Sequence, residues 1–408
     1  MDIINVAEKY EEEVIKHRRW LHQHAELSWE EYETTNYIEE ELRKIGLEPQ
    51  RFDDIDTGLY AMIYGGKAGA NAKTILLRAD IDALPIQEET GVSYASIYDG
   101  KMHACGHDSH VAMLLGAAKI LTEMQNDLEG NVKLLFQAAE ETANGAKRYV
   151  DAGVMVDVDA VYGCHIASFL DAPYVNVGPG PLFASCDEFK IIVKGVAAHG
   201  GAPNKGKDAV VAASNIVMSL QTMVSRINDP NNPLVITIGT INGGQRFNII
   251  ANHVEMEGTV RTYSREFRAD IDKRMGEVIN HAAQTMGCTA ELQYDWKTGP
   301  IIHDNKMMNE IVKEAAGKLF DQESLIELEK MTLSDDFAYF SEVAPGFYSI
   351  IGARNEELGC MYDHHHECFN IDESALKRGV AMHVQVALEF FNSVKNSGDT
   401  FVVEEAYE

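Results

Sequence analysis

Basic side chains are scarce in this sequence. Its 408 residues include 35 lysines and arginines against 64 aspartates and glutamates, which gives a formal net charge of −29 at pH 7. Nucleic acids and anionic membranes are bound through basic faces, so this balance argues against both as partners. No uninterrupted apolar run approaches the ~18 residues of a membrane-spanning helix, which also argues against a membrane partner. The acidity itself is typical of a soluble protein.

Grouped cysteines and a secretion signal are also missing. The six cysteines are scattered at positions 105, 164, 186, 288, 360 and 368, unlike the disulfide framework of a small secreted protein. The first ten residues lack the basic head and apolar core of a signal peptide. We therefore expect a cytoplasmic protein, in which reduced thiols remain available as metal ligands.

Three well-known catalytic motifs are absent: HExxH, GxSxG and the glycine-rich phosphate loop. The zincin, serine hydrolase and nucleotide-binding classes therefore have no support. The length of the chain predicts two domains, or one domain that carries an insertion.

The segment Met102–His110, with the sequence MHACGHDSH, combines three histidines, a cysteine and an aspartate directly before an apolar helical run. Thiolate, imidazole and carboxylate are the ligands of borderline divalent metals such as zinc. A helix N-terminus would also favour the deprotonated thiol of Cys105. Taken alone, the segment is also compatible with a surface turn that holds an inert cysteine, although the metal site is favoured.

Apolar strands alternate with helices in the N-terminal part of the chain, which predicts an α/β fold with a mostly parallel sheet. Strands are expected at Thr74–Leu77, Val132–Phe136 and Ala160–Cys164. The side chains that follow them are Asp80 and Asp82, Glu140 and Glu141, and His165. Because ligands bind at the carboxyl ends of parallel strands, we expect these side chains to meet the Cys105 segment at one edge.

The pattern changes after Cys186 to the order β-α-β-β-α-β, which is that of a ferredoxin-like α+β domain. It forms a complete unit and predicts an inserted domain. The expected boundaries are 1–186 and 299–408 for the two parts of the first domain and 187–298 for the insertion.

Near the N-terminus, residues 2–24 predict one amphipathic helix. The next helix is expected to open at Ser28, which has the spacing of a capping box with Glu31. His22 and His24 are interpreted as helix-end residues outside any metal site. Cys186, Cys288, Cys360 and Cys368 are interpreted as small buried or loop thiols.

Each candidate site residue also has a structural interpretation. Glu140 and Glu141 diverge, so one can bind a metal while the other moves a proton to or from a water, but they also suit a solvated helix start. His165 is alternatively a core histidine. Of the three histidines at 364–366, at most two can face one centre.

Asp80, Asp82 and His199 of the inserted domain likewise have both a structural and a functional interpretation. Asp80 and Asp82 either cap the turn before Pro85 or orient a ligand imidazole from behind. His199 is either a loop histidine or a donor that reaches the substrate when the domains close.

Motifs along essentially the whole chain have the order of one known family. They are Arg18–Leu27, Arg78–Pro85, His103–Asp108, Glu140-Glu141, His165, the His199 loop, Gly258–Arg261, Ser334–Phe337, and His365 four residues before Phe369. The chain resembles the dinuclear-metal aminoacylase/carboxypeptidase family, and most closely its amidohydrolase branch of hippurate, auxin-conjugate and aminobenzoyl-glutamate hydrolases and N-acetyl-diaminopimelate deacetylases. Ile166-Ala167-Ser168 departs from the family pattern close to the expected pocket.

The resemblance implies a metallopeptidase-like catalytic domain and a set of site residues. The implied metal ligands are Cys105, His107, Glu141, His165 and His365, with Cys105 as the bridging ligand. Glu140 would be the general base and acid, and Asp82 a catalytic aspartate near the metals. The implied substrate-binding residues are His199, Asn248 and Arg261, which the family often supplies from the partner subunit of a dimer.

The resulting hypothesis is a metal-dependent amidohydrolase that cleaves a small N-acyl amino acid or peptide-like amide. The resemblance implies two divalent ions per subunit and a homodimer formed through the inserted domain. Cysteine and imidazole favour zinc, with manganese, cobalt and nickel as alternatives. The competing hypotheses are a dipeptidase or carboxypeptidase of the same family and, in another class, a non-catalytic metal- or ligand-binding protein.

Overall fold

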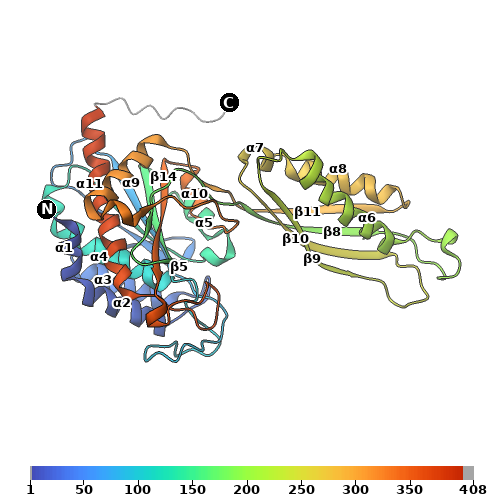
Figure 1. Cartoon of the computed structure of the whole chain (residues 1–408), viewed down its shortest axis with the longest axis horizontal. Coiled ribbons are helices and arrows are strands. Elements are labelled where there is room, and N and C mark those ends of the chain that lie inside the picture. Colours follow the sequence, from blue (N-terminus) through green and yellow to red (C-terminus); the bar gives the residue numbers. More distant parts are fainter. Residues whose placement is uncertain (1, 398–408) are drawn as a thin grey trace. The chain divides into compact units, whose positions relative to one another are not determined.

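The computed structural model describes residues 2–397 and divides the chain into two compact units (Figure 1). The first unit runs to Gly180 and resumes over His303–Glu329 and from Asp336 on. The second unit consists of Pro181–Ile302 and Lys330–Asp335. A short two-stranded sheet pairs β7 (Gly180–Phe183) with β12 (Ile301–His303).

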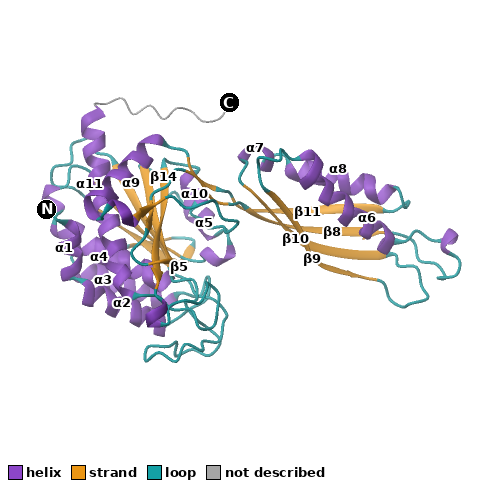
Figure 2. Ribbon diagram, viewed as in Figure 1, coloured by secondary structure: helices purple, strands orange, loops and turns teal. Residues whose placement is uncertain are grey.

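The first unit is built on an eight-stranded sheet (Figure 2). Its strands are β1 (Gln50–Phe52), β2 (Ile55–Ile63), β3 (Thr74–Asp80), β4 (Asn131–Gln137), β5 (Ala160–Asp171), β6 (Val175–Asn176), β13 (Leu325–Ile326) and β14 (Gly346–Arg354). Their order is β1-β2-β4-β3-β5-β14-β6-β13, and the central strands β4, β3, β5 and β14 run parallel. The predicted α/β class with a mostly parallel sheet is confirmed.

Helices cover both faces of this sheet. They are α1 (Ile3–Lys9), α2 (Glu11–Gln23), α3 (Tyr32–Lys44), α4 (His107–Glu123), α5 (Gly145–Asp151), α9 (Lys306–Leu319), α10 (Ala338–Ser341) and α11 (Leu376–Ser397). In Figure 1, α4 and α11 lie on one side of the sheet, and α5 and α10 lie on the other. The single helix predicted over residues 2–24 is wrong, because the chain breaks at Tyr10 into α1 and α2.

The central strands end at the same edge and thereby position the site. All seven residues of β3 are buried, as expected for a strand covered on both faces. β3 pairs Asp80 with Gln137 of β4 and Arg78 with Gly163 of β5, so His165 reaches the level of Asp80. β5 itself continues to Asp171 alongside β14, so the expectation that His165 follows a strand end is wrong.

The capping box predicted from Ser28 and Glu31 is also wrong. Neither side chain caps α3, which begins later than predicted. The cap is the carboxylate of Glu26, which accepts hydrogen bonds from the N–H groups of Glu33 at 3.1 Å and Thr34 at 2.8 Å. Because Glu26 satisfies these donors, the side chains of Ser28 and Glu31 are available for other contacts.

The second unit is a ferredoxin-like domain. Its elements are β8 (Cys186–Lys194), α6 (Ala209–Thr222), β9 (Leu234–Gly243), β10 (His253–Thr262), α7 (Arg265–Arg268), α8 (Ile271–Gln284) and β11 (Thr289–Thr298), and its antiparallel sheet has the order β11-β8-β10-β9. The helical segment Ala209–Ile227 is, by length and composition alone, long and apolar enough to cross a membrane. Its inner face nevertheless belongs to this unit's core, with Ile216 and Leu220 fully buried.

Candidate metal centre

Five side chains from separate segments of the first unit meet at one edge of the sheet. Cys105 and His107 flank the start of α4, Glu141 follows β4, His165 lies on β5, and His365 lies in the loop after β14. The ligand atoms of Cys105, His107 and His165 lie within 4.8 Å of one another, as do those of Cys105, Glu141 and His365. Cys105 is common to both groups, as a ligand that bridges two ions must be. The structure thus brings together all five predicted ligands.

Two atoms of this cluster are buried without a hydrogen-bond partner among residues 2–397: Nε2 of His107 and Oε1 of Glu141. They lie 3.9 Å apart, and the same Glu141 oxygen lies 3.6 Å from Nε2 of His365. Nδ1 of His107 faces the carboxylate of Asp82 at 3.2 Å, so Nε2 is the nitrogen that remains for a cation. Because unpaired buried polar atoms are costly, these residues fit a metal centre.

The electrostatics of the cluster also call for positive charge. Burial, together with the Glu141 carboxylate, raises the pKa of the Cys105 thiol well above its usual range. Burial likewise raises the pKa of Glu141 to about 7. The helix N-terminus, which the sequence suggested would favour the thiolate, therefore does not by itself lower the pKa of the Cys105 thiol, whereas a cation bound by these residues would lower it.

Backbone geometry fixes the two loops that carry Cys105 and His365. Gly106 has φ +87°, and a Cβ atom there would lie 2.3 Å from a methyl carbon of Ile166, so only glycine fits. The N–H group of His365 donates to the carbonyl of Ala104 at 2.8 Å, which ties the two loops together.

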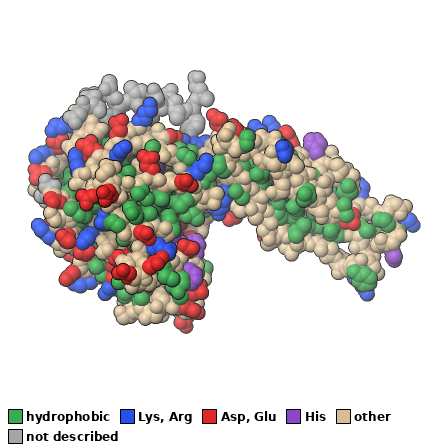
Figure 3. All heavy atoms as spheres, in the orientation of Figure 1, with side chains coloured by type: hydrophobic (Ala, Val, Ile, Leu, Met, Phe, Trp, Pro, Cys, Tyr) green, Lys and Arg blue, Asp and Glu red, His purple; other side chains and the backbone are tan. Residues whose placement is uncertain are grey.

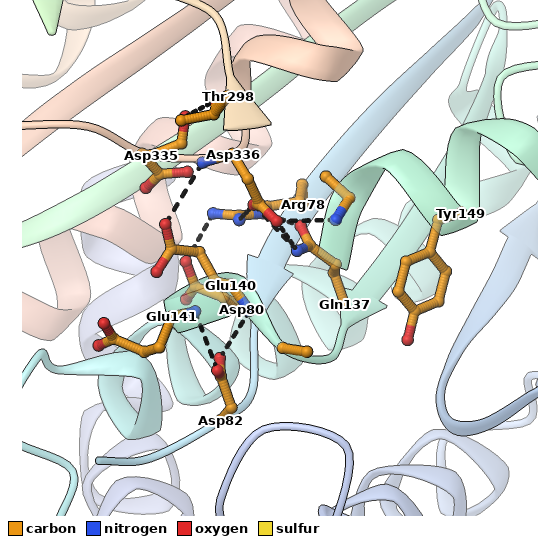
Figure 4. Close-up of polar contacts among 12 residues, drawn as sticks. Arg78, Asp80, Asp82, Gln137, Glu140, Glu141, Tyr149, Thr298, Asp335 and Asp336 are labelled. Carbon is orange, nitrogen blue, oxygen red and sulfur yellow. Dashed lines mark hydrogen bonds and ion pairs between the residues drawn. The ribbon is translucent and has the colours of Figure 1, made fainter. Parts of the chain in front are cut away.

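Asp82 holds two parts of the centre at once (Figure 4). Its Oδ1 atom faces His107 Nδ1 and accepts the N–H of Glu140 at 3.1 Å. Its Oδ2 atom accepts the N–H of Glu141 at 3.1 Å and the hydroxyl of Ser28 at 2.7 Å. Burial acts to raise the pKa of Asp82, but the hydrogen bonds from His107 and Ser28 outweigh it, so the pKa lies below its usual value. Asp82 is therefore placed to orient groups as a carboxylate.

Glu140 points away from Glu141, toward the turn that precedes α10 (Figure 4). Its Oε1 atom accepts the N–H of Asp336 at 3.3 Å, and its Oε2 atom lies 3.9 Å from His107 Nε2. The Asp336 carboxylate in turn accepts from Arg78 at 2.8 Å and from Gln137 at 2.9 Å. The Glu140 carboxylate thus lies beside the candidate ligands but is held in a different direction from Glu141.

Of the three histidines in Met102–His110, only His107 shares a candidate metal group with Cys105, whereas His110 lies in a separate group with Asp80 and His107. His103 lies in none of the candidate metal groups among residues 2–397, and burial lowers its pKa to about 4. His110 binds Asp80 through Nδ1 and accepts the N–H of Ile166 through Nε2 at 2.9 Å. Both nitrogens of His110 are therefore occupied, and it fixes the backbone next to His165.

Other residues of the motifs act behind the centre. Arg18 and His22 bind the carboxylate of Asp108 at 3.0 and 2.8 Å, which anchors the first turn of α4. His364 packs its ring against that of His165, with 5.1 Å between centroids, and accepts the N–H of Ser168 at 3.4 Å. Of the histidines at 364–366, His365 is the one that approaches Glu141.

The three substrate-binding candidates lie in the second unit. His199 and Asn248 are exposed and lie on adjacent loops, because the N–H of Gly200 donates to the carbonyl of Asn248 at 2.8 Å. Arg261 lies on β10 and donates to the carbonyl of Thr332 at 2.8 Å.

Fold and centre together define a metal-dependent hydrolase of the α/β class. The chain belongs to the family described as peptidase family M20/M25/M40, whose sequence profile matches residues 76–389. Metal-dependent hydrolysis of amide bonds, predicted from the motifs, is thereby confirmed as its activity class.

Two relatives and one solved structure illustrate the match. Thermostable carboxypeptidase 2 of Saccharolobus solfataricus is 37% identical over 398 residues, which cover 96% of this chain and 100% of the relative. N-acetyl-L-cysteine deacetylase of Bacillus subtilis is 40% identical over 366 residues, which cover 90% and 85%. A dinuclear metal binding peptidase from Bacillus subtilis superposes with a TM-score of 0.83 at 34% identity, covering 95% and 100%. These findings support two divalent ions in the centre.

Proposed function

We propose that this protein hydrolyses the amide bond of N-acyl amino acids, with Glu140 as general base and acid. The observation that carries the proposal is the position of the Glu140 carboxylate, which lies 3.9 Å from His107 Nε2. It accepts the N–H of Asp336 and therefore points away from the Glu141 carboxylate. Such a carboxylate can take a proton from a water beside the ligands and deliver it to the leaving amine.

The proposed metal ligands are Cys105, His107, Glu141, His165 and His365. When bound, the two ions supply Lewis-acid polarisation of the amide carbonyl and a water of lowered pKa. A set of one thiol, three imidazoles and one carboxylate favours zinc, whereas manganese, cobalt and nickel remain candidates to be tested. The part of Asp82 is to hold His107 and the N–H groups of Glu140 and Glu141.

The substrate class rests on the relatives. The deacetylase acts, by its name, on an N-acyl amino acid, and the carboxypeptidase acts on peptides. We place the deacylase first because that relative has the higher identity, and a carboxypeptidase or dipeptidase second. The six cysteines are all free, which is in keeping with a cytoplasmic location.

The second unit would supply the remaining substrate contacts and a dimer interface. His199, Asn248 and Arg261 are the proposed contacts to the substrate carboxylate or the oxyanion. Apolar side chains are exposed on the surface of this unit (Figure 3). They include Val211 and Met218 on α6 and Ile241 on β9, one of the two edge strands of its sheet. Exposed apolar side chains and an open strand edge support pairing with a second copy of the chain.

A substrate panel on defined metal forms tests the proposal. Protein stripped by a chelator and reloaded with zinc, manganese, cobalt or nickel is assayed for amine release from N-acetyl-L-cysteine, N-benzoylglycine and blocked dipeptides. We expect metal-dependent turnover of N-acyl amino acids, and loss of it in Glu140→Gln with metal content unchanged. The exposed Glu357→Gln serves as the control. Faster cleavage of peptides would favour the carboxypeptidase, and turnover by Glu140→Gln would refute the assigned base.

A further inference from the structure

The turn that carries Glu140 is held by side chains through four consecutive N–H groups. The N–H of Ala138 donates to the Tyr149 hydroxyl at 3.0 Å, that of Ala139 to Oε1 of Glu31 at 2.9 Å, and those of Glu140 and Glu141 to the two oxygens of Asp82. Asp82 and Tyr149 flank the turn in Figure 4. Such a run of side-chain acceptors replaces the neighbouring-strand partner that the backbone lacks after β4 ends.

The turn needs this support because its backbone is unfavourable. Ala139 has φ +60° and Ala143 has φ +56°, the left-handed region that residues with a Cβ atom rarely adopt. At Gly145 a Cβ atom would lie 2.4 Å from the carbonyl oxygen of Ala139, so the following helix packs directly on the strained peptide. A contact made by the N–H of Ala139 therefore acts on the left-handed residue that directly precedes Glu140.

Glu31 makes that contact from a distant part of the sequence, and its side chain does not cap helix α3. Its residue is fully buried, and Glu26 caps α3 instead. Burial and the nearby Asp82 raise the pKa of Glu31 to about 7. Ser28, three residues earlier, donates to Asp82. Two side chains of one turn are thus directed at the catalytic loop, at the cost of burying a carboxyl group.

We propose that Glu31 is a positioning residue for the reaction: by accepting the N–H of Ala139 it holds this left-handed residue in the conformation that directs the Glu140 carboxylate. The proposal rests on the proposed function, in which Glu140 is the base. Glu31 contacts the turn through the N–H of Ala139 and lies in none of the candidate metal groups among residues 2–397. Its loss therefore lowers turnover while leaving metal and substrate binding intact.

The experiment compares three substitutions in the full-length, metal-loaded protein. Glu31→Gln keeps an oxygen that can accept the N–H of Ala139 and retains kcat near wild type. Glu31→Met removes the acceptor at similar volume, and Glu31→Asp withdraws it by one methylene. Both lower kcat by about 10- to 100-fold, as expected for a misaligned catalytic group, with KM within about twofold. The neighbouring exposed residue provides the matched control, Glu30→Met, which stays at wild-type kcat.

Metal content and thermal unfolding are measured on every variant. A folded, fully metallated Glu31→Met or Glu31→Asp with wild-type kcat overturns the proposal, as does a Glu31→Gln that is as slow as Glu31→Met. Parallel loss of metal content and kcat also overturns it, because the role is then structural. If Glu31→Met fails to fold, Glu31→Asp decides the outcome. Turnover by Glu140→Gln, assayed alongside, contradicts the proposed base, whereas an inactive Glu140→Gln with unaffected Glu31 variants contradicts only the positioning role.

Discussion

Nη2 of Arg78 donates to Oδ1 of Asp336 at 2.8 Å, across 258 positions of sequence and with both side chains buried. The pair joins the end of β3 to the turn before α10, and the N–H of Asp336 reaches Glu140. One buried ion pair therefore links the late C-terminal segment of the first unit to the proposed base.

Replacing Asp336 by alanine tests how much the ion pair between Arg78 and Asp336 contributes to stability. The Arg78 guanidinium would lose a buried carboxylate partner, so we expect the free energy of unfolding to fall by about 3–5 kcal/mol. Chemical denaturation measures the loss. Asp151→Ala, which removes an exposed partner of Lys147, should cost less than about 0.5 kcal/mol. Equal effects of the two substitutions would contradict the importance of the buried pair.

Gly106→Ala should damage the metal centre. The new Cβ atom would meet Ile166 at 2.3 Å in a left-handed backbone, so the Cys105 loop must shift. We expect metal affinity to fall by about 10- to 100-fold, the range seen when supports of metal ligands are altered. Gly100→Ala is a matched control, because Gly100 has φ +73° with open space around it. Competition with a chelator distinguishes them, and similar affinities would count against the loop geometry.

Cys105→Ala should affect both ions, since Cys105 belongs to both groups of candidate ligands. Elemental analysis is expected to find a loss of metal from about two ions per subunit, whereas single loss of His165 or His365 should weaken one position. Cys186→Ala, in the second unit, should leave the metal content unchanged. Two ions retained in Cys105→Ala would exclude a bridging role.

The stability of the first unit should depend on pH through His303. Burial lowers the pKa of His303 to about 4, and its neutral ring donates to the Gly178 carbonyl at 2.9 Å and accepts the N–H of Tyr348 at 3.2 Å. The unfolded state, with a pKa of about 6.5, binds the proton first, so this stabilisation is complete above pH 6.5 and is lost as pH falls toward 4.

The expected slope from His303 is about 1.4 kcal/mol per pH unit within that window. Unfolding by denaturant at several pH values should give a flatter profile for His303→Gln than for the wild type. The exposed His281→Gln on α8 should keep the wild-type slope. An unchanged slope in His303→Gln would show that other groups control the acid limb.

The sequence predicted the parts whose signals are local and repeated. The apolar run of β3 and the motifs at its carboxyl end were sufficient to place Asp82, Glu140 and Glu141 at one edge of the sheet. The β-α-β-β-α-β pattern likewise predicted the antiparallel unit, because each strand alternates and each helix has one apolar face.

The errors arose where a tertiary contact overrides a local pattern. Ser28 and Glu31 have the spacing of a capping box, but only the folded chain places Glu26 at the N-terminus of α3. Spacing could not reveal that Asp80 and Ile166 occupy both ring nitrogens of His110. Nor could it reveal that Nε2 of His107 has no hydrogen-bond partner among the described residues. Asp336 lies in the motif Ser334–Phe337, but its partner Arg78 is far away in sequence, so the motif alone did not reveal this contact.

The strand order of the first unit determines when its sheet can be completed during synthesis. β14 lies between β5 and β6 in the sheet. In the chain, however, β5 and β6 precede the second unit and β14 follows it, so β14 is synthesised last of the three. Until then the nascent sheet has an unfilled place, and long-range pairing of this kind is slow and exposed to aggregation. His365 is synthesised later still, so a chain that ends before it lacks one of the five proposed ligands. We therefore expect such a truncated chain to bind metal incompletely.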